Sequence, residues 1–154
     1  MSITPLPPLD RLRAATAVLA AKRRTGLKWA DLGRAVDRST EWTTAALLGQ
    51  HPLTAEQAAA LGSALGLDAP IVEALELPPV RGAHVVDTSE PIVYRLQEMV
   101  QVYGRTITEL VREEFGDGIV SAIDFEMDLK RVADPKGDRV VITLNGKFLP
   151  YRSW

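Results

Sequence analysis

The first half of the chain carries apolar residues at helical spacing, interrupted at short intervals by glycines and by residues that cap helices. The pattern predicts five helices, over residues 10–24, 29–36, 40–48, 54–65 and 68–75. Thr54 and Gln57 have the three-residue spacing of a capping box at the start of the fourth helix. The residues expected to form the buried stripe of the first helix are Leu9, Leu12, Thr16, Leu19 and Ala20.

The pattern changes in kind after residue 76. The run Leu77-Pro78-Pro79-Val80-Arg81-Gly82 breaks the helical spacing and predicts an extended linker. We therefore expect a flexible, proline-rich N-terminus over residues 1–8, a helical bundle over 9–76, a linker over 77–87 and a second domain over 88–154.

The second domain mixes helices with short strands, which makes the fold class α+β. One helix is expected to run to Tyr103, with Gly104 interrupting it, and another from Thr106 to Phe115. Three strands follow, over residues 120–132, 139–144 and 147–149. Two turns are expected to join them, one at Asp134-Pro135-Lys136-Gly137 and a hairpin turn at Asn145-Gly146.

Two helices and a few short strands in this small domain cannot easily stand alone. Small sheets are marginal unless they pack on something, and their open edges need a partner. We therefore expect another subunit to complete the second domain.

Composition narrows the classes of function. Lys and Arg total 18 against 20 Asp and Glu, a net charge of −2, whereas a non-specific polyanion binder is usually basic. The chain has no cysteine, which excludes disulfides, thiolate metal sites and a cysteine nucleophile. Its two histidines, His51 and His84, lack metal-ligand spacing and are expected to be loop or surface residues. No apolar run is long enough to span a membrane, and residues 1–8 lack the features of a signal peptide, so we expect a cytoplasmic protein.

A helix-turn-helix regulator is the main alternative to an enzyme. Residues 27–50 have the pattern of two helices joined by a short turn, as in many repressors. However, basic and acidic residues balance over residues 1–80, and the would-be recognition helix Glu41-Trp42-Thr43-Thr44-Ala45-Ala46-Leu47-Leu48 has no Arg or Lys. Phosphate neutralisation supplies most non-specific DNA affinity, so we expect no nucleic-acid binding.

The first candidate site lies on the helix that starts at Pro91, where Ser89 or Glu90 can act as the cap. Its apolar stripe consists of Ile92, Leu96, Met99 and Tyr103. Arg95 and Glu98 are three residues apart, so they are neighbours beside this stripe and border surface that we expect to be buried. The alternative is an ordinary helix ion pair, worth only about 0.2–0.5 kcal/mol.

The second candidate site follows a glycine turn. Gly116-Asp117-Gly118 has no helical or strand period, and glycine takes positive φ at little cost. Ser121 follows near the start of a strand, where its hydroxyl and nearby backbone N–H groups could bind an oxyanion. The alternative is a structural hydroxyl at the start of a strand.

Taken together, these motifs resemble the cyanase (cyanate hydratase, cyanate lyase) family. The matching runs, in order, are Tyr94-Arg95 to Glu98-Met99, Gln101-Val102-Tyr103-Gly104, Phe115-Gly116-Asp117-Gly118-Ile119, Ser121-Ala122-Ile123, Val132-Ala133-Asp134-Pro135, Val141-Ile142-Thr143-Leu144 and Gly146-Lys147 with Leu149-Pro150. The first half resembles the family more weakly, through Thr44-Ala45-Ala46-Leu47-Leu48-Gly49-Gln50 and Leu77-Pro78-Pro79-Val80-Arg81-Gly82.

The resemblance implies a carbon–oxygen lyase that converts cyanate and bicarbonate to carbamate and carbon dioxide, the carbamate then yielding ammonia. It implies catalytic roles for Arg95, Glu98 and Ser121, with bicarbonate as a co-substrate and no metal or organic cofactor. It also implies a decamer built from five dimers, whose C-terminal domains, here residues 88–154, are catalytic and interlock, with active sites between subunits. The family's N-terminal domain is similar in shape to DNA-binding helical domains, so shape alone is a poor guide to function.

Overall fold

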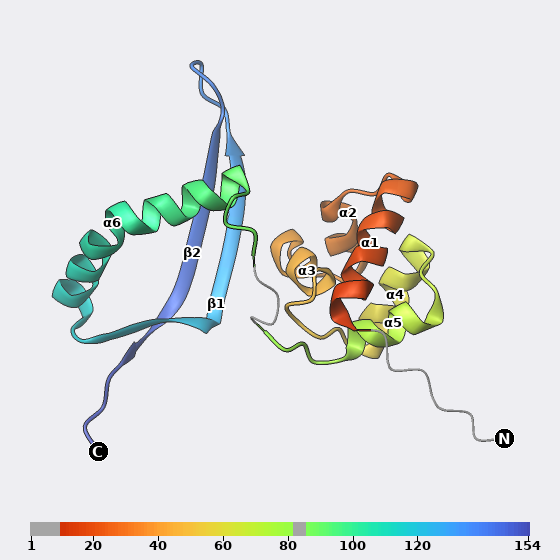
Figure 1. The fold of residues 1–154 in the computed structure, drawn as a ribbon, viewed down its shortest axis with the longest axis horizontal. Coiled ribbons are helices and arrows are strands. Elements are labelled where there is room, and N and C mark those ends of the chain that lie inside the picture. The colour runs from red at the N-terminus through yellow and green to blue at the C-terminus, as the bar shows by residue number, and fades with distance from the viewer. Residues whose placement is uncertain (1–9, 82–85) are drawn as a thin grey trace. The chain divides into compact units, whose positions relative to one another are not determined.

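The computed structural model describes residues 10–81 and 86–154, which form two compact units (Figure 1). The first unit ends at Arg81 and the second begins at Gly82, a division inside the range predicted as the linker. The predictions for residues 1–8, for Leu9 and for His84 lie outside the described residues.

The described part of the first unit contains five helices, and each lies within about two residues of its predicted range. They are α1 (Arg11–Thr25), α2 (Trp29–Ala35), α3 (Thr40–Leu47), α4 (Ala55–Leu65) and α5 (Ala69–Glu76). The predicted capping box is present, because Thr54 accepts a hydrogen bond from the Gln57 N–H while Gln57 accepts one from the Thr54 N–H. Asp10 caps α1 by accepting a hydrogen bond from the Arg13 N–H, and Gly26 ends the helix in the left-handed conformation.

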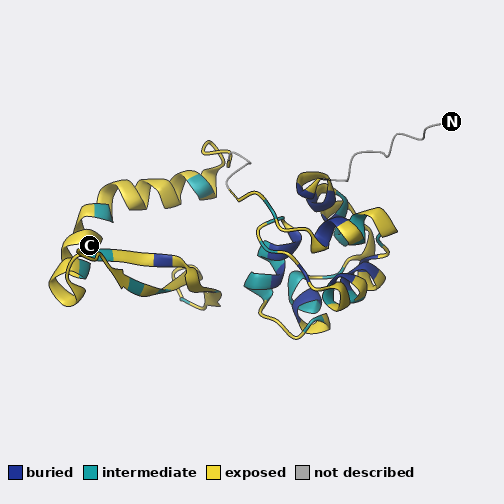
Figure 2. Cartoon of the chain, turned by 90° about the horizontal axis from the view of Figure 1, so that it is seen from below, coloured by how far each residue is buried: buried dark blue, intermediate teal, exposed yellow. Residues whose placement is uncertain are grey.

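The buried face of α1 differs from the predicted stripe. Leu12 is 51% exposed and Leu19 is 37% exposed, while Ala14, Val18 and Ala21 are buried. Thr16 and Ala20 are exposed as well, so the predicted stripe is wrong. The side of α1 that packs inward carries mainly small side chains, which allow neighbouring helices to approach closely. The described core of this unit is concentrated in its helices (Figure 2). The buried residues that pack into one cluster are Ala14, Val18, Ala21, Leu32, Ala46, Leu47, Leu53, Ala58, Leu61, Leu65, Ala74 and Leu75.

A buried arginine also lies on this face of α1. The Arg11 guanidinium donates to the backbone carbonyls of Ala74 at 3.1 Å, Ala46 at 2.7 Å and His51 at 2.8 Å. Two of these carbonyls belong to the last turns of α3 and α5, where helix carbonyls have no partner within the helix. Arg11 therefore links three elements, and burial lowers the pKa of its guanidinium.

The second unit contains a single long helix, α6 (Pro91–Phe115), capped by the Glu90 carboxylate, which accepts from the N–H groups of Ile92 and Val93. The predicted interruption at Gly104 is wrong, because α6 continues through that residue. A single interior glycine costs a helix only about 1 kcal/mol relative to alanine, which the rest of a helix this long can offset.

A two-stranded antiparallel sheet follows, formed by β1 (Gly118–Val132) and β2 (Arg139–Pro150). The turn predicted at Asp134 to Gly137 is confirmed, with the Lys136 N–H donating to the Asp134 side chain. The turn predicted at Asn145-Gly146 is wrong, since both residues lie within β2 and pair with β1. The two predicted strands on either side of it are therefore one strand.

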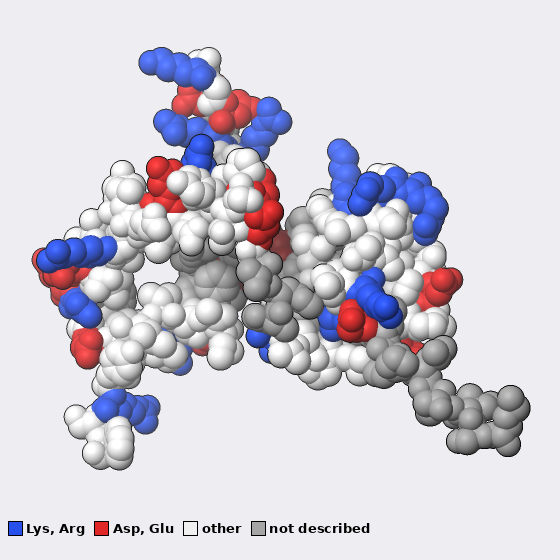
Figure 3. All heavy atoms as spheres, in the orientation of Figure 1, with Lys and Arg blue, Asp and Glu red and all other residues white. Residues whose placement is uncertain are grey.

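Most of the second unit is exposed (Figure 2). No described residue of α6 is buried: Ile92, Met99 and Tyr103 of its apolar stripe are more than half exposed, and Leu96 is 42% exposed. Much of the face of this unit seen in Figure 3 carries neither acidic nor basic side chains. The burial expected beside Arg95 and Glu98 is thus not provided by the second unit itself.

Candidate active site

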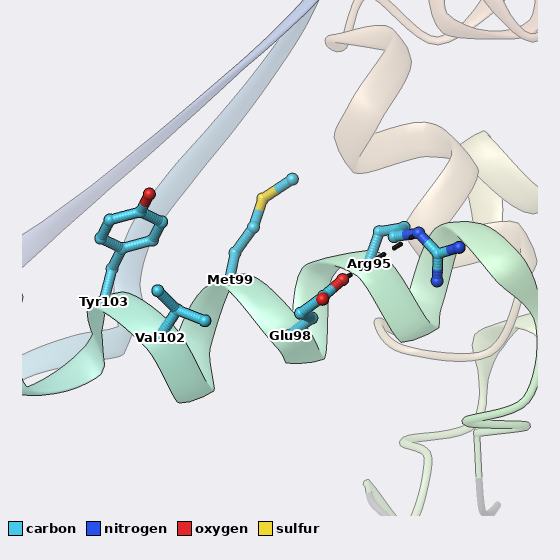
Figure 4. A pocket seen from close by; sticks show the side chains of 5 residues that line it. All are labelled: Arg95, Glu98, Met99, Val102 and Tyr103. Carbon is cyan, nitrogen blue, oxygen red and sulfur yellow. Dashed lines mark ion pairs between the residues drawn. The ribbon is translucent and has the colours of Figure 1, made fainter.

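Arg95 and Glu98 lie one turn apart on α6 and form an ion pair (Figure 4). The Arg95 Nε and Glu98 Oε2 atoms are 4.0 Å apart, and the side chains are 62% and 55% exposed. An exposed pair at this distance adds little to stability, because water screens the attraction. The Arg95 guanidinium also lies 5.1 Å from the centre of the Tyr94 ring, in cation–π range. The pair therefore leaves most of the Arg95 hydrogen-bond donors available to a ligand.

The two charged side chains border a shallow hollow on α6 (Figure 4). Met99, Val102 and Tyr103 complete its lining, and its volume is about 250 Å³. One water molecule takes up about 30 Å³ in the liquid, so the hollow has room for more than one small anion. One charged end and one apolar end give the hollow the mixed lining that is usual in small-molecule sites.

Sequence reasoning found the charged end of this hollow but gave its apolar end another role. Met99 and Tyr103 were expected to form part of a packed stripe, with Val102 near it. In the structure these three side chains line the hollow with Arg95 and Glu98. Their spacing on the helix was the available signal, since residues three and four apart share a face.

Ser121 lies on β1 and is only 5% exposed. Its Oγ accepts hydrogen bonds from the backbone N–H groups of Ile123 at 3.1 Å and Asp124 at 2.9 Å. The hydroxyl proton is not used by these two bonds, so Ser121 can still donate it to an anion. Within one chain Ser121 is not among the residues that line the hollow, which brings Arg95 and Glu98 together without it.

Ser121 opens a wide bulge in β1. Val120 pairs with Phe148 and Phe125 pairs with Gly146, so residues 121–124 lie opposite Lys147 alone. Bulges of this kind re-aim side chains and are common beside functional sites. The Ser121 side chain closes the bulge from within, because its Oγ satisfies two backbone N–H groups that have left the ladder.

The predicted turn before β1 is confirmed. Gly116 has a φ of 91°, which glycine adopts without a steric cost, and the Asp117 carbonyl accepts a hydrogen bond from the Tyr151 N–H. The Phe115 and Phe148 rings lie 5.2 Å apart, on either side of this turn in the sequence. The end of α6 is thereby held against the sheet that carries Ser121.

Other kinds of site find little support in the part of the chain that the structure describes. No group of three or more His, Cys, Asp and Glu side chains is arranged there to hold a metal ion. His51 stacks on Trp42, with ring centres 5.8 Å apart. None of the described helices is both long enough and apolar enough to cross a membrane. Helices α2 and α3 have the succession of a helix-turn-helix, but α3 carries no Lys or Arg.

Comparisons with known proteins agree on one family. A model described as the N-terminal part of cyanate hydratase matches residues 11–79, and one described as the cyanate lyase C-terminal domain matches residues 85–153. Cyanate hydratases of Thiobacillus denitrificans and Methylobacillus flagellatus are 53% and 49% identical over 95% of this chain and all of theirs. The crystal structure of cyanase from T. urticae matches 89% of this chain and 96% of its own, at 31% identity and a TM-score of 0.79. The chain belongs to the cyanate hydratase (cyanate lyase) family.

Proposed function

We propose that this protein is a cyanate hydratase that decomposes cyanate with bicarbonate, and that Arg95, Glu98 and Ser121 form its active site. The hollow that places Arg95 and Glu98 beside an apolar surface is the structural observation that supports the proposal most strongly. Family membership supports the choice of cyanate as substrate.

Arg95 is the anion-binding group in this proposal. Cyanate and bicarbonate are both negatively charged, so bringing them together requires fixed positive charge. A guanidinium keeps its proton at any relevant pH, and its planar set of donors matches the planar oxygens of bicarbonate. Arg95 is suited to this role because its ion pair with Glu98 is loose, at 4.0 Å.

Glu98 acts as the positioning residue for Arg95. A bare carboxylate would repel both substrates, so direct binding is a poor role for it. Once association of copies excludes water from the site, the charge of Glu98, one turn further along α6, restrains the guanidinium at the charged end of the hollow. Glu98 is also the only carboxyl group among the residues that line the hollow, so it is the side chain best placed to pass a proton to the substrates.

Ser121 completes the site from a second copy of the chain. The hollow in one chain lacks Ser121, and the apolar surface around it is exposed. Association of copies would cover this surface and exclude water, which strengthens electrostatic interactions with the substrates. A decamer built from dimers is the assembly that we propose, with the C-terminal units in contact.

The chemistry that these groups must support is an addition followed by a decarboxylation. A bicarbonate oxygen attacks the cyanate carbon and forms a new C–O bond, while the cyanate nitrogen takes up a proton. Cleavage of the bond between that oxygen and the former bicarbonate carbon then releases carbon dioxide. The bicarbonate proton and one from solution both end on nitrogen, which gives carbamate; carbamate then yields ammonia and a second carbon dioxide. Holding two reactants in attack geometry can lower the barrier by about 7–11 kcal/mol.

The bicarbonate requirement tests this function directly. Purified protein mixed with cyanate should release ammonia in buffer that contains bicarbonate and almost none in buffer freed of carbon dioxide. Adding bicarbonate back should restore the rate. Ammonia release at full rate without bicarbonate would show simple hydrolysis, and no release under either condition would contradict the proposed function.

A further inference from the structure

Gly146 lies where β2 crosses the bulge that holds Ser121. It pairs with Phe125, the first residue after the bulge. A Cβ atom built on Gly146 would lie 2.4 Å from the Ser121 carbonyl oxygen and 2.6 Å from Val120 Cγ1. Real Cβ atoms essentially never come closer than 3.0 Å to such neighbours. Any residue other than glycine here would therefore push against the backbone of Ser121 itself.

The conformation of Gly146 is not what requires a glycine. The glycines with positive φ in the described chain are Gly26, Gly49, Gly66, Gly116 and Gly137, and Gly146 is not among them. A positive φ is thus not the reason for a glycine at this position. What glycine provides at this position is space, which the Ser121 carbonyl occupies.

The carbonyl and the side chain of Ser121 are displaced together. Ser121 Oγ is held by the N–H groups of Ile123 and Asp124, so the residue sits at the start of a short closed loop. If the Ser121 carbonyl moved so that the 2.4 Å gap reached about 3.0 Å, the Cα and the hydroxyl attached to it would move as well. Misplacement of a catalytic group by about 1 Å can cost about 100-fold in rate.

We propose that Gly146 is a positioning residue for Ser121. Because Gly146 has no side chain, the Ser121 carbonyl can pack directly against β2, and this contact sets where the Ser121 hydroxyl points. The part of this inference that concerns catalysis rests on the proposed function. The part that concerns the position of Ser121 does not, so the two are tested by different measurements.

The structural measurement is amide hydrogen exchange over residues 121–125 of the full-length protein. Gly146→Ala should speed exchange at the Ile123 and Asp124 amides, whose bonds to Ser121 Oγ it disturbs, and leave the pairs from Met127 to Val132 protected. The matched control is Asn145→Ala, the adjacent exposed residue of β2, which already carries a Cβ and should leave exchange in the bulge unchanged. Unchanged exchange in Gly146→Ala would overturn the proposal, as would a global loss of structure, because the ladder on both sides is expected to persist.

The catalytic measurement is a double-mutant cycle on cyanate turnover. Gly146→Ala should lower kcat by about 10- to 100-fold. The same change in a Ser121→Ala background should have almost no further effect, because the group that it positions is already gone. If the fold-losses in kcat of the two single variants multiplied in the double variant, Gly146 would act independently of Ser121 and its proposed positioning role would be overturned. If the unmutated protein did not turn over cyanate, the proposed function would fail while the exchange measurement still decided whether Gly146 positions Ser121.

Discussion

The ion pair between Arg95 and Glu98 contributes little to the stability of the fold, yet Arg95 has a central role in the proposed site. At 4.0 Å and more than half exposed, its contact with Glu98 contributes little to folding, so the side chain can be removed without harm to the fold. Its proposed value is the positive charge that it presents to two anions.

We expect Arg95→Ala to lower cyanate turnover by at least about 100-fold, the typical cost of removing a group that stabilises developing charge. The melting temperature should change little. Arg105→Ala is the matched control, since Arg105 is an exposed arginine on the same helix that does not line the hollow. Steady-state ammonia release measures both variants, and an Arg95→Ala protein that kept its activity would remove Arg95 from the site.

The imidazole of His51 gives the first unit a dependence on pH. Burial, and then the nearby positive charge of Arg81, lower the pKa of His51 below its ordinary value. The unfolded chain therefore binds a proton more readily, at a pKa of about 6.5, and the free energy of unfolding should fall as the pH falls through this value. Urea unfolding at pH 7.5 and 5.5 measures the effect, with His51→Gln as the variant that cannot titrate. Equal losses in the two proteins would show that His51 is not responsible.

The pairing of Arg95 with Glu98 could be predicted from the sequence because a helix places residues three apart side by side. The environment of these residues could not. Spacing beside an apolar stripe predicted burial, yet the stripe is exposed in a single chain, because helical periodicity identifies an apolar face without saying which molecule covers it. The predicted burial of Leu12 and Leu19 was wrong for a related reason, since the size of an apolar side chain alone does not decide which face of α1 packs inward.

Among the elements, α1 depends on a polar contact as much as on its apolar face. The Arg11 guanidinium joins the carbonyls at the ends of α3 and α5 and that of His51. Sequence patterns treat arginine as a surface residue, so this link could not be predicted from composition or spacing.

Arg11→Met should destabilise the first unit by about 3 kcal/mol or more, because it removes three hydrogen bonds that a charged guanidinium makes to backbone carbonyls. Arg13→Ala, which removes an exposed arginine two residues further along α1, should change the free energy of unfolding by less than about 0.5 kcal/mol. Urea unfolding followed by tryptophan fluorescence compares the two, because Trp29 and Trp42 lie in this unit. Equal stabilities would contradict the structural role of Arg11.

The sequence predicted most accurately those features that depend on hydrogen bonds between residues two to four positions apart. The capping box of α4 and the turn at Asp134 to Gly137 are both confirmed. The same rules failed at Gly104 and at Asn145-Gly146, where the surrounding structure overrides the local preference. The single glycine does not end α6. At Asn145-Gly146, β2 continues to pair with β1 in place of the predicted turn. The bulge at Ser121 depends on the register between two strands, which no local pattern contains.

At the scale of the whole molecule, the second unit exposes the apolar stripe of α6 and carries the residues of the proposed site in two separate places. Its chain carries Arg95 and Glu98 at the hollow and Ser121 in a separate bulge. Large exposed apolar surfaces usually mark interaction sites. A shared site between copies accounts for both features, and a decamer would have a solution mass near ten times the 16.8 kDa of one chain.

Co-assembly of two impaired variants tests the shared site most directly. Arg95→Ala and Ser121→Ala chains, each expected to keep only residual activity alone, are unfolded together, refolded as a mixture and assayed for ammonia release from cyanate and bicarbonate. If Arg95 and Ser121 of one site come from different chains, random mixing leaves both residues intact at about one site in four, and about a quarter of the unmutated activity should return. A mixed oligomer with only that residual activity would contradict the account, because it would mean that each site takes both residues from one chain or does not use them together.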